Sequence, residues 1–324
     1  MSEPKAAPRQ LTLVAAFGAL YLIWGSTYLG ILFAIKSIPP LLMAGSRFFF
    51  AGVIMYVIAL RQGTRKTSLA EWRTAIVLGA CLLFFGNGGV TIAEQWVPSG
   101  LASLLVATVP IYIALFAWLT GVAPRPGPLV LLGLAGGFVG VGVLVGPALT
   151  AAPAGGSQHA GLGMLILLFG SLMWSIGSLY SRRARNTASP FLSSAQTMLC
   201  GGGLMIGAGL MLGEARNFHL NQMTALSLGA FAYLVLIGAV VGYTAYIWLL
   251  RHCDPSKVAT YAYVNPVVAV LLGAFFAGET ITLRTALAAA IIVGSVALVI
   301  TAQQAREKIP LLSRPQLHKP TETG

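Results

Sequence analysis

The sequence predicts an all-α membrane protein in which ten transmembrane helices form two inverted five-helix repeats. Of its 324 residues, 57% are hydrophobic and only 9% are charged. Charged residues make up about 25% of an ordinary soluble domain, so a soluble globular protein is excluded, as are a disordered chain and a fibre. Because one helix needs about 20 apolar residues to cross a bilayer, the chain is long enough for ten crossings.

Charged residues and Pro/Gly clusters mark the ends of the apolar segments. The first segment has no charge from 10 to 35, which is too long for a signal-peptide core, so we expect a retained first span. The charge-free stretch 126–181 must hold two spans, because a polar, turn-rich segment divides it. In chain order the expected spans are 11–33, 40–60, 73–93, 98–120, 128–146, 161–181, 188–212, 226–250, 256–278 and 283–302.

Basic residues follow the positive-inside rule along these spans. With the N-terminus in the cytoplasm, Arg47 sits within a span, and all other Lys and Arg are on the cytoplasmic side except Lys36, Arg216 and Arg284. The net charge of +12 therefore reflects membrane orientation, and we expect no nucleic-acid partner. The chain is expected in the cell inner membrane, in contact with the lipid bilayer and with both termini in the cytoplasm. Its expected parts are a cytoplasmic N-terminus (1–10), a first repeat (11–146), an extracytoplasmic linker (147–160), a second repeat (161–302) and a cytoplasmic tail (303–324).

The two repeats are indicated by motifs that recur in the same order, about 150 to 157 residues apart. Residues 97–103 (VPSGLAS) match 254–260 (DPSKVAT), and Pro110 and Pro266 follow them. Residues 24–28 (WGSTY) match 174–180 (WSIGSLY). Five spans are an odd number, so the second copy enters the membrane the opposite way up. Such halves are typical of transporters, with the substrate near the midplane between them. Chance similarity between apolar stretches is the alternative.

The same motifs resemble those of the EamA family of the drug/metabolite transporter superfamily. The similarity runs from about residue 11 to 302. It implies ten helices in two inverted repeats, a pore lined by spans 1, 3, 4, 6, 8 and 9, and export of amino acids or related metabolites by inner-membrane carriers. The residues that carry it are Trp24–Tyr28, Pro39–Pro40 with Ala44–Phe48, Ala93–Gln95 with Pro98–Gly100, Met173–Tyr180, Tyr261–Pro266 and Gly278–Thr280.

Polar residues inside a span are costly and are therefore functional candidates. Asn87, Thr91 and Glu94 recur at i, i+4 and i+7 and share one face of the third span. Two of these residues have a structural alternative. Asn87 can form a hydrogen bond between helices, and the Thr91 hydroxyl can bond to its own helix backbone, which we favour for Thr91. Ser103 lies in the fourth span, after the repeated VPSG motif.

Aromatic residues with hydroxyl neighbours form the second group of candidates. Trp24 and Trp174 lie too deep for the interfacial belt, so we expect both to face a cavity, although belt residues remain the alternative. Aromatic faces with hydroxyls suit a zwitterionic or aromatic metabolite. The candidates of this group are Trp24, Thr27, Tyr28, Trp174, Ser178, Tyr243, Thr244, Tyr261, Tyr263 and Asn265.

Two prolines and one arginine complete the candidates. Pro110 and Pro266 remove backbone donors within their spans, so each creates either a hinge with a free carbonyl or a static kink. Arg47 lies about 10 Å inside the second span. We expect it to form an ion pair or outer gate with Glu94 or Glu279. The alternatives are snorkelling to the surface and contact with a substrate carboxylate.

The sequence gives no sign of an enzyme, a cofactor or a metal site. Cys81, Cys200 and Cys253 are scattered, and the histidines lie in loops or the tail. No Walker motif is present, and no acidic residue lies near the middle of a span, which predicts a uniporter or exchanger. We therefore expect a secondary transporter of a small-molecule substrate, working as a monomer or homodimer. The alternatives are a channel-like facilitator, a carrier of another metabolite or drug class, and an intramembrane enzyme.

Overall fold

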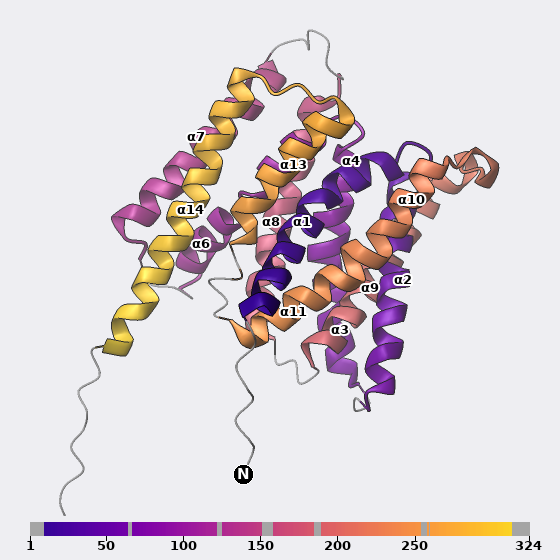
Figure 1. Cartoon of the computed structure of the whole chain (residues 1–324), viewed down its shortest axis with the longest axis horizontal. Coiled ribbons are helices and arrows are strands. Elements are labelled where there is room, and N and C mark those ends of the chain that lie inside the picture. The colour runs from indigo at the N-terminus through magenta and orange to yellow at the C-terminus, as the bar shows by residue number, and fades with distance from the viewer. Residues whose placement is uncertain are drawn as a thin grey trace, which may run out of the picture.

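A computed structural model shows a bundle of long helices, and it describes residues 10–312 except 64–66, 122–124, 151–157, 185–188, 254–257 and 259. Regular structure in the described part is helical throughout, as the sequence predicts. The first turn of α1 and the last turns of α14 lie toward the same side of the bundle (Figure 1). The N-terminal segment 1–9, the central part of the predicted linker (151–157) and the end of the predicted tail (313–324) fall outside the described residues.

The first half of the chain contains α1 to α7. The third predicted span consists of α3, the π-helix η1 and α4, and the fourth consists of α5 and α6. The elements are α1 (Gln10–Ala34), α2 (Pro40–Arg61), α3 (Leu69–Leu78), η1 (Gly79–Asn87), α4 (Gly88–Ala93), α5 (Ser99–Val106), α6 (Val109–Leu119) and α7 (Pro128–Thr150).

The second half repeats this order of long and divided helices. The eighth predicted span consists of α10, the π-helix η4 and α11, so both π-helices occupy the middle of corresponding spans. The elements are α8 (Ala160–Arg183), α9 (Pro190–Met211), the 3-10 turns η2 (Glu214–Asn217) and η3 (Leu220–Gln222), α10 (Ala225–Tyr233), η4 (Leu234–Val241), α11 (Gly242–His252), α13 (Tyr261–Ala277) and α14 (Leu283–Leu312).

Eight helices of the described chain are long and apolar enough to cross a membrane. Two further helices occupy predicted spans without meeting that criterion. One is α9, which has 22 residues, and the other is α13, which is apolar but has 17 described residues. The described part of the chain is therefore all-helical, with eight candidate membrane spans.

Several predicted boundaries differ from those of the structure. The third span starts at Leu69 instead of 73, because Ser68 and Glu71 form a capping box in which each side chain bonds to the other's backbone N–H. The last helix continues to Leu312, so the start of the predicted tail is helical. Ala, Gln, Arg, Glu and Lys are good helix formers, and they occupy 302–308.

Helices of one half pack mainly on helices of the other. The most extensive contacts join α2 to α9 and α7 to α14, and Figure 1 shows the second of these pairs at one edge of the bundle. In addition, α1 packs on α13 and on the α10–η4–α11 span, while α8 packs on α5–α6 and on the α3–η1–α4 span. The contacts of the two halves thus correspond pair by pair.

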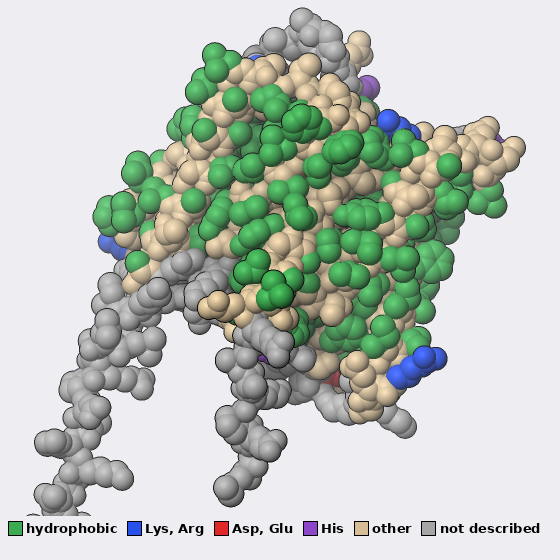
Figure 2. Space-filling view, viewed as in Figure 1, with side chains coloured by type: hydrophobic (Ala, Val, Ile, Leu, Met, Phe, Trp, Pro, Cys, Tyr) green, Lys and Arg blue, Asp and Glu red, His purple; other side chains and the backbone are tan. Residues whose placement is uncertain are grey.

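The outer surface of the bundle is largely apolar, as a lipid-facing surface should be. Figure 2 shows hydrophobic side chains over most of the visible face, with a few Lys and Arg side chains near its edges. Exposed apolar side chains include Leu22 in α1 and Phe275 and Phe276 in α13, which are 63%, 80% and 67% exposed. In water, such a surface would favour aggregation, whereas lipid tails solvate it.

Candidate functional site

Four aromatic rings from both halves of the chain meet inside the bundle. Trp24 of α1 contacts Tyr243 and Tyr246 of α11 and Tyr261 of α13, with ring centroids 5.6, 5.1 and 5.1 Å apart. Tyr246 also lies 6.0 Å from Tyr261 and 6.3 Å from Tyr243. We call these four residues the aromatic cluster. The Trp24 ring therefore packs against other helices of the bundle, and its position beside a substrate cavity stays a prediction.

A glycine makes room for the Trp24 ring. A Cβ placed on Gly242, at the start of α11, would lie 2.6 Å from the indole Nε1 and 3.0 Å from Cδ1. Such a distance is far shorter than carbon contacts in packed interiors, so only glycine lets the indole approach this backbone. The counterpart in the other half is Trp174 of α8, whose ring would lie 2.8 Å from a Cβ on Gly86 of η1.

Other predicted residues surround Trp24 on α1 and α13. The Thr27 hydroxyl donates to the Trp24 carbonyl oxygen at 2.7 Å, and Tyr28 is half-buried one turn farther along α1. Asn265 of α13 is buried; with its amide nitrogen turned toward α1, it donates to the carbonyl oxygens of Tyr21 and Tyr261 at 3.2 and 3.3 Å. The sequence therefore identified several residues that the fold brings together from distant segments.

Arg47 is a buried cation on α2. Its side chain is 3% exposed, Nη2 donates to Asn87 Oδ1 at 3.2 Å, and the guanidinium lies 4.2 Å from the centroid of the Phe48 ring. Its Nε has no hydrogen-bond partner. Snorkelling to the surface is therefore wrong for this arrangement, because the charged group stays inside the bundle.

Glu94 is a buried carboxylate directly after α4. It is also 3% exposed, and neither of its carboxyl oxygens has a hydrogen-bond partner. Because helix side chains tilt toward the N-terminus, Glu94 extends back along the helix face that carries Thr91 and Asn87. Arg47, Tyr28 and Glu279 all lie within its electrostatic range.

The ion pair expected between Arg47 and Glu94 or Glu279 does not form in this arrangement. Arg47 is turned to Asn87, and Glu94 accepts no hydrogen bond. Glu279 binds elsewhere: its carboxylate accepts from Ser99 N at 2.6 Å, Ser99 Oγ at 2.7 Å and Gly100 N at 2.9 Å. The free N–H groups at the start of α5 attract the carboxylate because they carry the positive end of the helix dipole.

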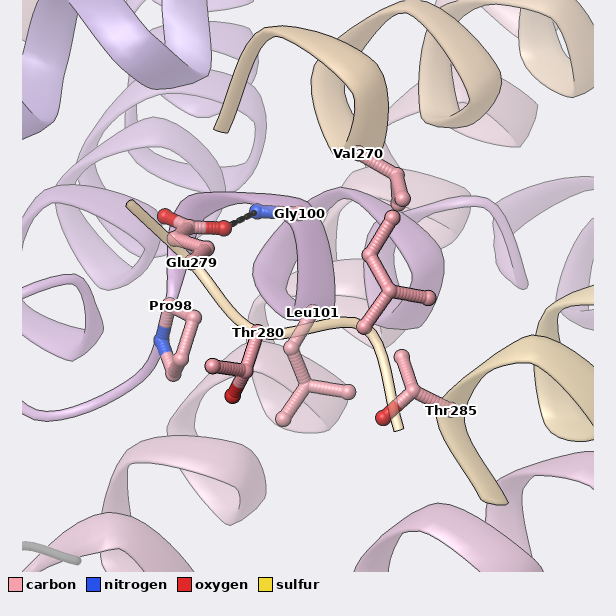
Figure 3. A pocket seen from close by; sticks show the side chains of 8 residues that line it. Pro98, Gly100, Leu101, Val270, Glu279, Thr280 and Thr285 are labelled. Atoms are coloured by element: carbon pink, nitrogen blue, oxygen red, sulfur yellow. Dashed lines mark hydrogen bonds between the residues drawn. The ribbon is translucent and has the colours of Figure 1, made fainter. Parts of the chain in front are cut away.

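The contact between Glu279 and α5 joins the second half of the chain to the first (Figure 3). It borders a cavity of about 60 Å³ that Pro98, Leu101, Val270 and Thr285 help to line. A similar contact lies at α2, where Glu214 accepts from Leu41 N and Leu42 N at 3.1 and 2.9 Å. We call these two contacts the glutamate latches, since each fixes the N-terminus of a first-half helix.

Like Thr27, four further predicted residues use their hydroxyl groups to bond to their own helices. Thr91, Ser103, Ser178 and Thr244 donate to the carbonyl oxygens of Asn87, Gly100, Trp174 and Val240. Thr91 and Ser103 are fully buried, whereas Thr244 is exposed and faces away from the aromatic cluster. A residue beside Tyr243 is turned by about 100° around the helix, which places Thr244 on another face of α11, and its role as a lining residue stays a prediction.

The remaining candidates lie in the bundle but outside the aromatic cluster. Trp174 of α8 packs against Gly86 of η1, and Tyr263 is half-buried on α13. Pro110 is in the first turn of α6, so the fourth span is interrupted there, whereas Pro266 lies inside the continuous helix α13. The structure thus shows a break beside Pro110, and both the hinge and the static kink remain open as its interpretation.

Tyr246, which the sequence groups with the other aromatic residues of the eighth and ninth spans, completes the aromatic cluster. One functional feature was missed in the sequence. Glu214 and its latch had no local signal, because its partners lie in α2, far away in the sequence. Among the described residues, no three His, Cys, Asp or Glu side chains gather where a metal ion could bind.

Comparison with known proteins gives consistent matches over the whole bundle. The model of the EamA-like transporter family matches residues 11–146 and again 161–301. The uncharacterized inner membrane transporter YedA of Escherichia coli (strain K12) is 39% identical over 295 residues, covering 89% of this chain and 90% of YedA. The uncharacterized transporter YvbV of Bacillus subtilis (strain 168) is 25% identical over 304 residues, covering 94% and 96%. One solved crystal structure has a similar fold, with a TM-score of 0.61, 21% identity and coverage of 91% of this chain and 100% of that one.

Proposed function

Because the chain belongs to the EamA-like transporter family, we propose that it is a secondary transporter that moves small metabolites by alternating access. Membership in this family points to a membrane transporter and not to an enzyme. The relative YedA, which its name places in the inner membrane, supports the same location here, with several apolar spans. We expect amino acids or related compounds as substrates, and the export direction comes from the family resemblance.

The observation that carries the proposal is the origin of the aromatic cluster. Trp24 comes from the first half, and Tyr243, Tyr246 and Tyr261 come from the second. A site between two halves changes its exposure when they rock against each other, as alternating access requires. The rings can stack on an apolar or aromatic side chain, and their faces attract an ammonium group.

An inverted duplication of ten spans is the architecture that we propose for this mechanism. Four observations support it: two matches of the family model, the corresponding helix contacts, the π-helices in corresponding spans, and the Trp–Gly contacts in both halves. In addition, the glycines with positive φ occur in two pairs, Gly63 with Gly213 and Gly121 with Gly278, and each follows a corresponding helix. Gates at opposite ends would then be built from equivalent parts.

The glutamate latches supply the proposed outer gate. In the predicted topology, α2 and α5 both begin at the extracytoplasmic side, where Glu214 and Glu279 hold them to the second half. Opening that side requires at least the Glu279 contact to break while the halves separate.

Counterflow in proteoliposomes tests the proposed function. The purified protein is reconstituted with an unlabelled mixture of the common amino acids inside, and uptake of each labelled amino acid is followed. A carrier gives saturable uptake that is accelerated by internal substrate, and Trp24→Ala reduces it. Unsaturable flux without counterflow would indicate a channel, and no flux of any amino acid would contradict the proposed substrate class.

A further inference from the structure

Arg47 and Glu94 are buried charges that lie in each other's electrostatic field without touching. Both carboxyl oxygens of Glu94 and the Nε of Arg47 lack a hydrogen-bond partner. Each side chain is 3% exposed, so solvent does not replace the missing partners. Burying an unpaired charge costs several kcal/mol in real proteins, and a buried carboxyl group avoids this cost by taking a proton or a close cation.

We propose that these two residues form a proton-linked substrate site, in which Arg47 binds the carboxylate of the substrate while Glu94 carries a proton. This proposal rests on the proposed function and adds the chemical group that is recognised and the ion that accompanies it. The free Nε of Arg47 supplies a buried donor for the substrate oxygen, beside the Nη2 that holds Asn87. Arginine suits this role because its planar group presents several donors to a carboxylate.

Charge balance explains why proton and substrate bind together. Without substrate, an ionised Glu94 and Arg47 can offset each other's charge. When a substrate carboxylate takes Arg47, an ionised Glu94 would be left with no compensating cation. A hydronium ion of the solvent then protonates Glu94, which forms the carboxyl O–H bond and leaves water. When the substrate leaves on the other side, this bond breaks and the proton passes to the solvent there. One carboxylate and one proton thus cross in the same direction.

The surroundings of Glu94 favour this linkage. α1 presents Tyr28, α2 presents Arg47, and the segment after α13 presents Glu279, whose carboxylate is bound to the N-terminus of α5. α8, which packs along α4, presents apolar groups such as Ile166, close to Gly89. Arg47 is therefore the cation that acts on Glu94, while Glu279 adds a second negative charge.

The inference revises the expected driving force. The sequence predicts uniport or exchange because no acidic residue lies near the middle of a span, and Glu94 is close to the end of its own span. The structure places the side chain inside the closed bundle, where its charge state matters for the energy of the site. Efflux of an abundant metabolite would carry protons outward, and an acid exterior would favour uptake.

Infrared difference spectroscopy of the purified protein, with and without an added mixture of amino acids, tests the proton on Glu94 directly. A neutral carboxyl group has a C=O stretching band that a carboxylate lacks. We expect this band to appear at neutral pH when the amino acids are added to the wild type, and not to appear in Glu94→Gln. Glu214→Gln is the matched control, because both oxygens of that side chain accept backbone N–H groups, and its substitution should leave the band in place. An absent band, or a band that persists in Glu94→Gln, would overturn the proposal.

Flux in proteoliposomes tests the coupling, with a mixture of labelled amino acids as the probe. One proton per substrate predicts that an acid exterior of one pH unit raises accumulation in the wild type up to about tenfold. The flux that remains in Glu94→Gln should not respond to the gradient, and Glu94→Asp should restore the response. Wild-type counterflow that ignores the gradient would overturn the coupling and leave the carrier intact. Absence of counterflow would contradict the proposed function, and the infrared band would still decide the state of Glu94.

Discussion

The indole of Trp24 lies directly on the backbone of Gly242, in a space that a methyl group would fill. A Cβ at Gly242 would approach the ring to 2.6 Å at its Nε1. This contact ties α1 of the first half to α11 of the second half and orients the ring toward Tyr243, Tyr246 and Tyr261. The position of the aromatic cluster therefore depends on a residue that has no side chain.

Gly242→Ala should disturb the aromatic cluster. The added methyl group must displace Trp24 or separate α1 from α11, and overpacking of this kind costs about 1–3 kcal/mol. We expect a lower melting temperature in detergent and reduced counterflow. Gly229→Ala in α10 is the control, because a Cβ there meets nothing within 4 Å. Equal effects of the two substitutions would argue against the proposed packing.

Adjacent glycines in α9 should respond in opposite ways to substitution by alanine. A Cβ on Gly202 would lie 2.6 Å from Phe49 N and 2.8 Å from Gly45 O of α2, whereas a Cβ on Gly203 meets nothing within 4 Å. Gly202→Ala must push α2 from α9 and should lower the melting temperature. Gly203→Ala should be neutral or stabilising by up to about 1 kcal/mol, since alanine is the better helix former. A stable Gly202→Ala protein would contradict the close approach of these helices.

Glu279→Gln should weaken the latch at α5. The substitution keeps the shape and removes the charge from three hydrogen bonds to Ser99 and Gly100. Hydrogen bonds to charged groups contribute about 1.5–3 kcal/mol each, so we expect a clear loss of thermal stability. Gly273→Ala should have a similar effect, because its Cβ would lie 2.8 Å from Glu279 Cδ. Wild-type melting temperatures in both variants would exclude a structural role for the latch.

Tyr243→Ala and Thr244→Val should affect counterflow differently, because the two residues lie on different faces of α11. Removal of Tyr243 takes a ring from the aromatic cluster, and a pair of aromatic rings contributes about 0.5–1.5 kcal/mol beyond its buried area. We expect weaker apparent affinity in counterflow. Thr244 is exposed, and its hydroxyl is satisfied by Val240 O at 2.7 Å, so its replacement should leave counterflow as in the wild type. The reverse result would place the substrate on the other face.

Much of the bundle was predictable because its signals are local. Apolar runs, basic loops and repeated motifs gave the spans, and composition alone gave an all-helical membrane protein. Trp24, Tyr243 and Tyr261 could be selected as deep aromatic residues with nearby hydroxyls. Their mutual contact could not be derived, because it depends on how α1, α11 and α13 pack and on the space at Gly242.

The parts that sequence reasoning missed depend on partners distant in the chain. Glu279 was expected near Arg47, whereas the start of α5 supplies three nearer donors. The depth of Glu94 was inferred from its distance to the end of the span. This distance does not show that neighbouring helices bury the side chain. Thr244 was grouped with Tyr243, although adjacent residues occupy different faces of a helix, and only the packing of α11 shows which face is inside.

The opposed orientation of the two halves is the central claim, and labelling of engineered cysteines tests it most directly. Gln62 and Leu212 are exposed residues at corresponding positions, each next to a glycine with positive φ at the end of α2 or α9. With Cys81, Cys200 and Cys253 replaced, single cysteines are introduced at these two positions and treated in intact cells with a maleimide that does not cross membranes. The account predicts labelling of Leu212→Cys from outside and of Gln62→Cys only after permeabilisation. Labelling of both from the same side would contradict it.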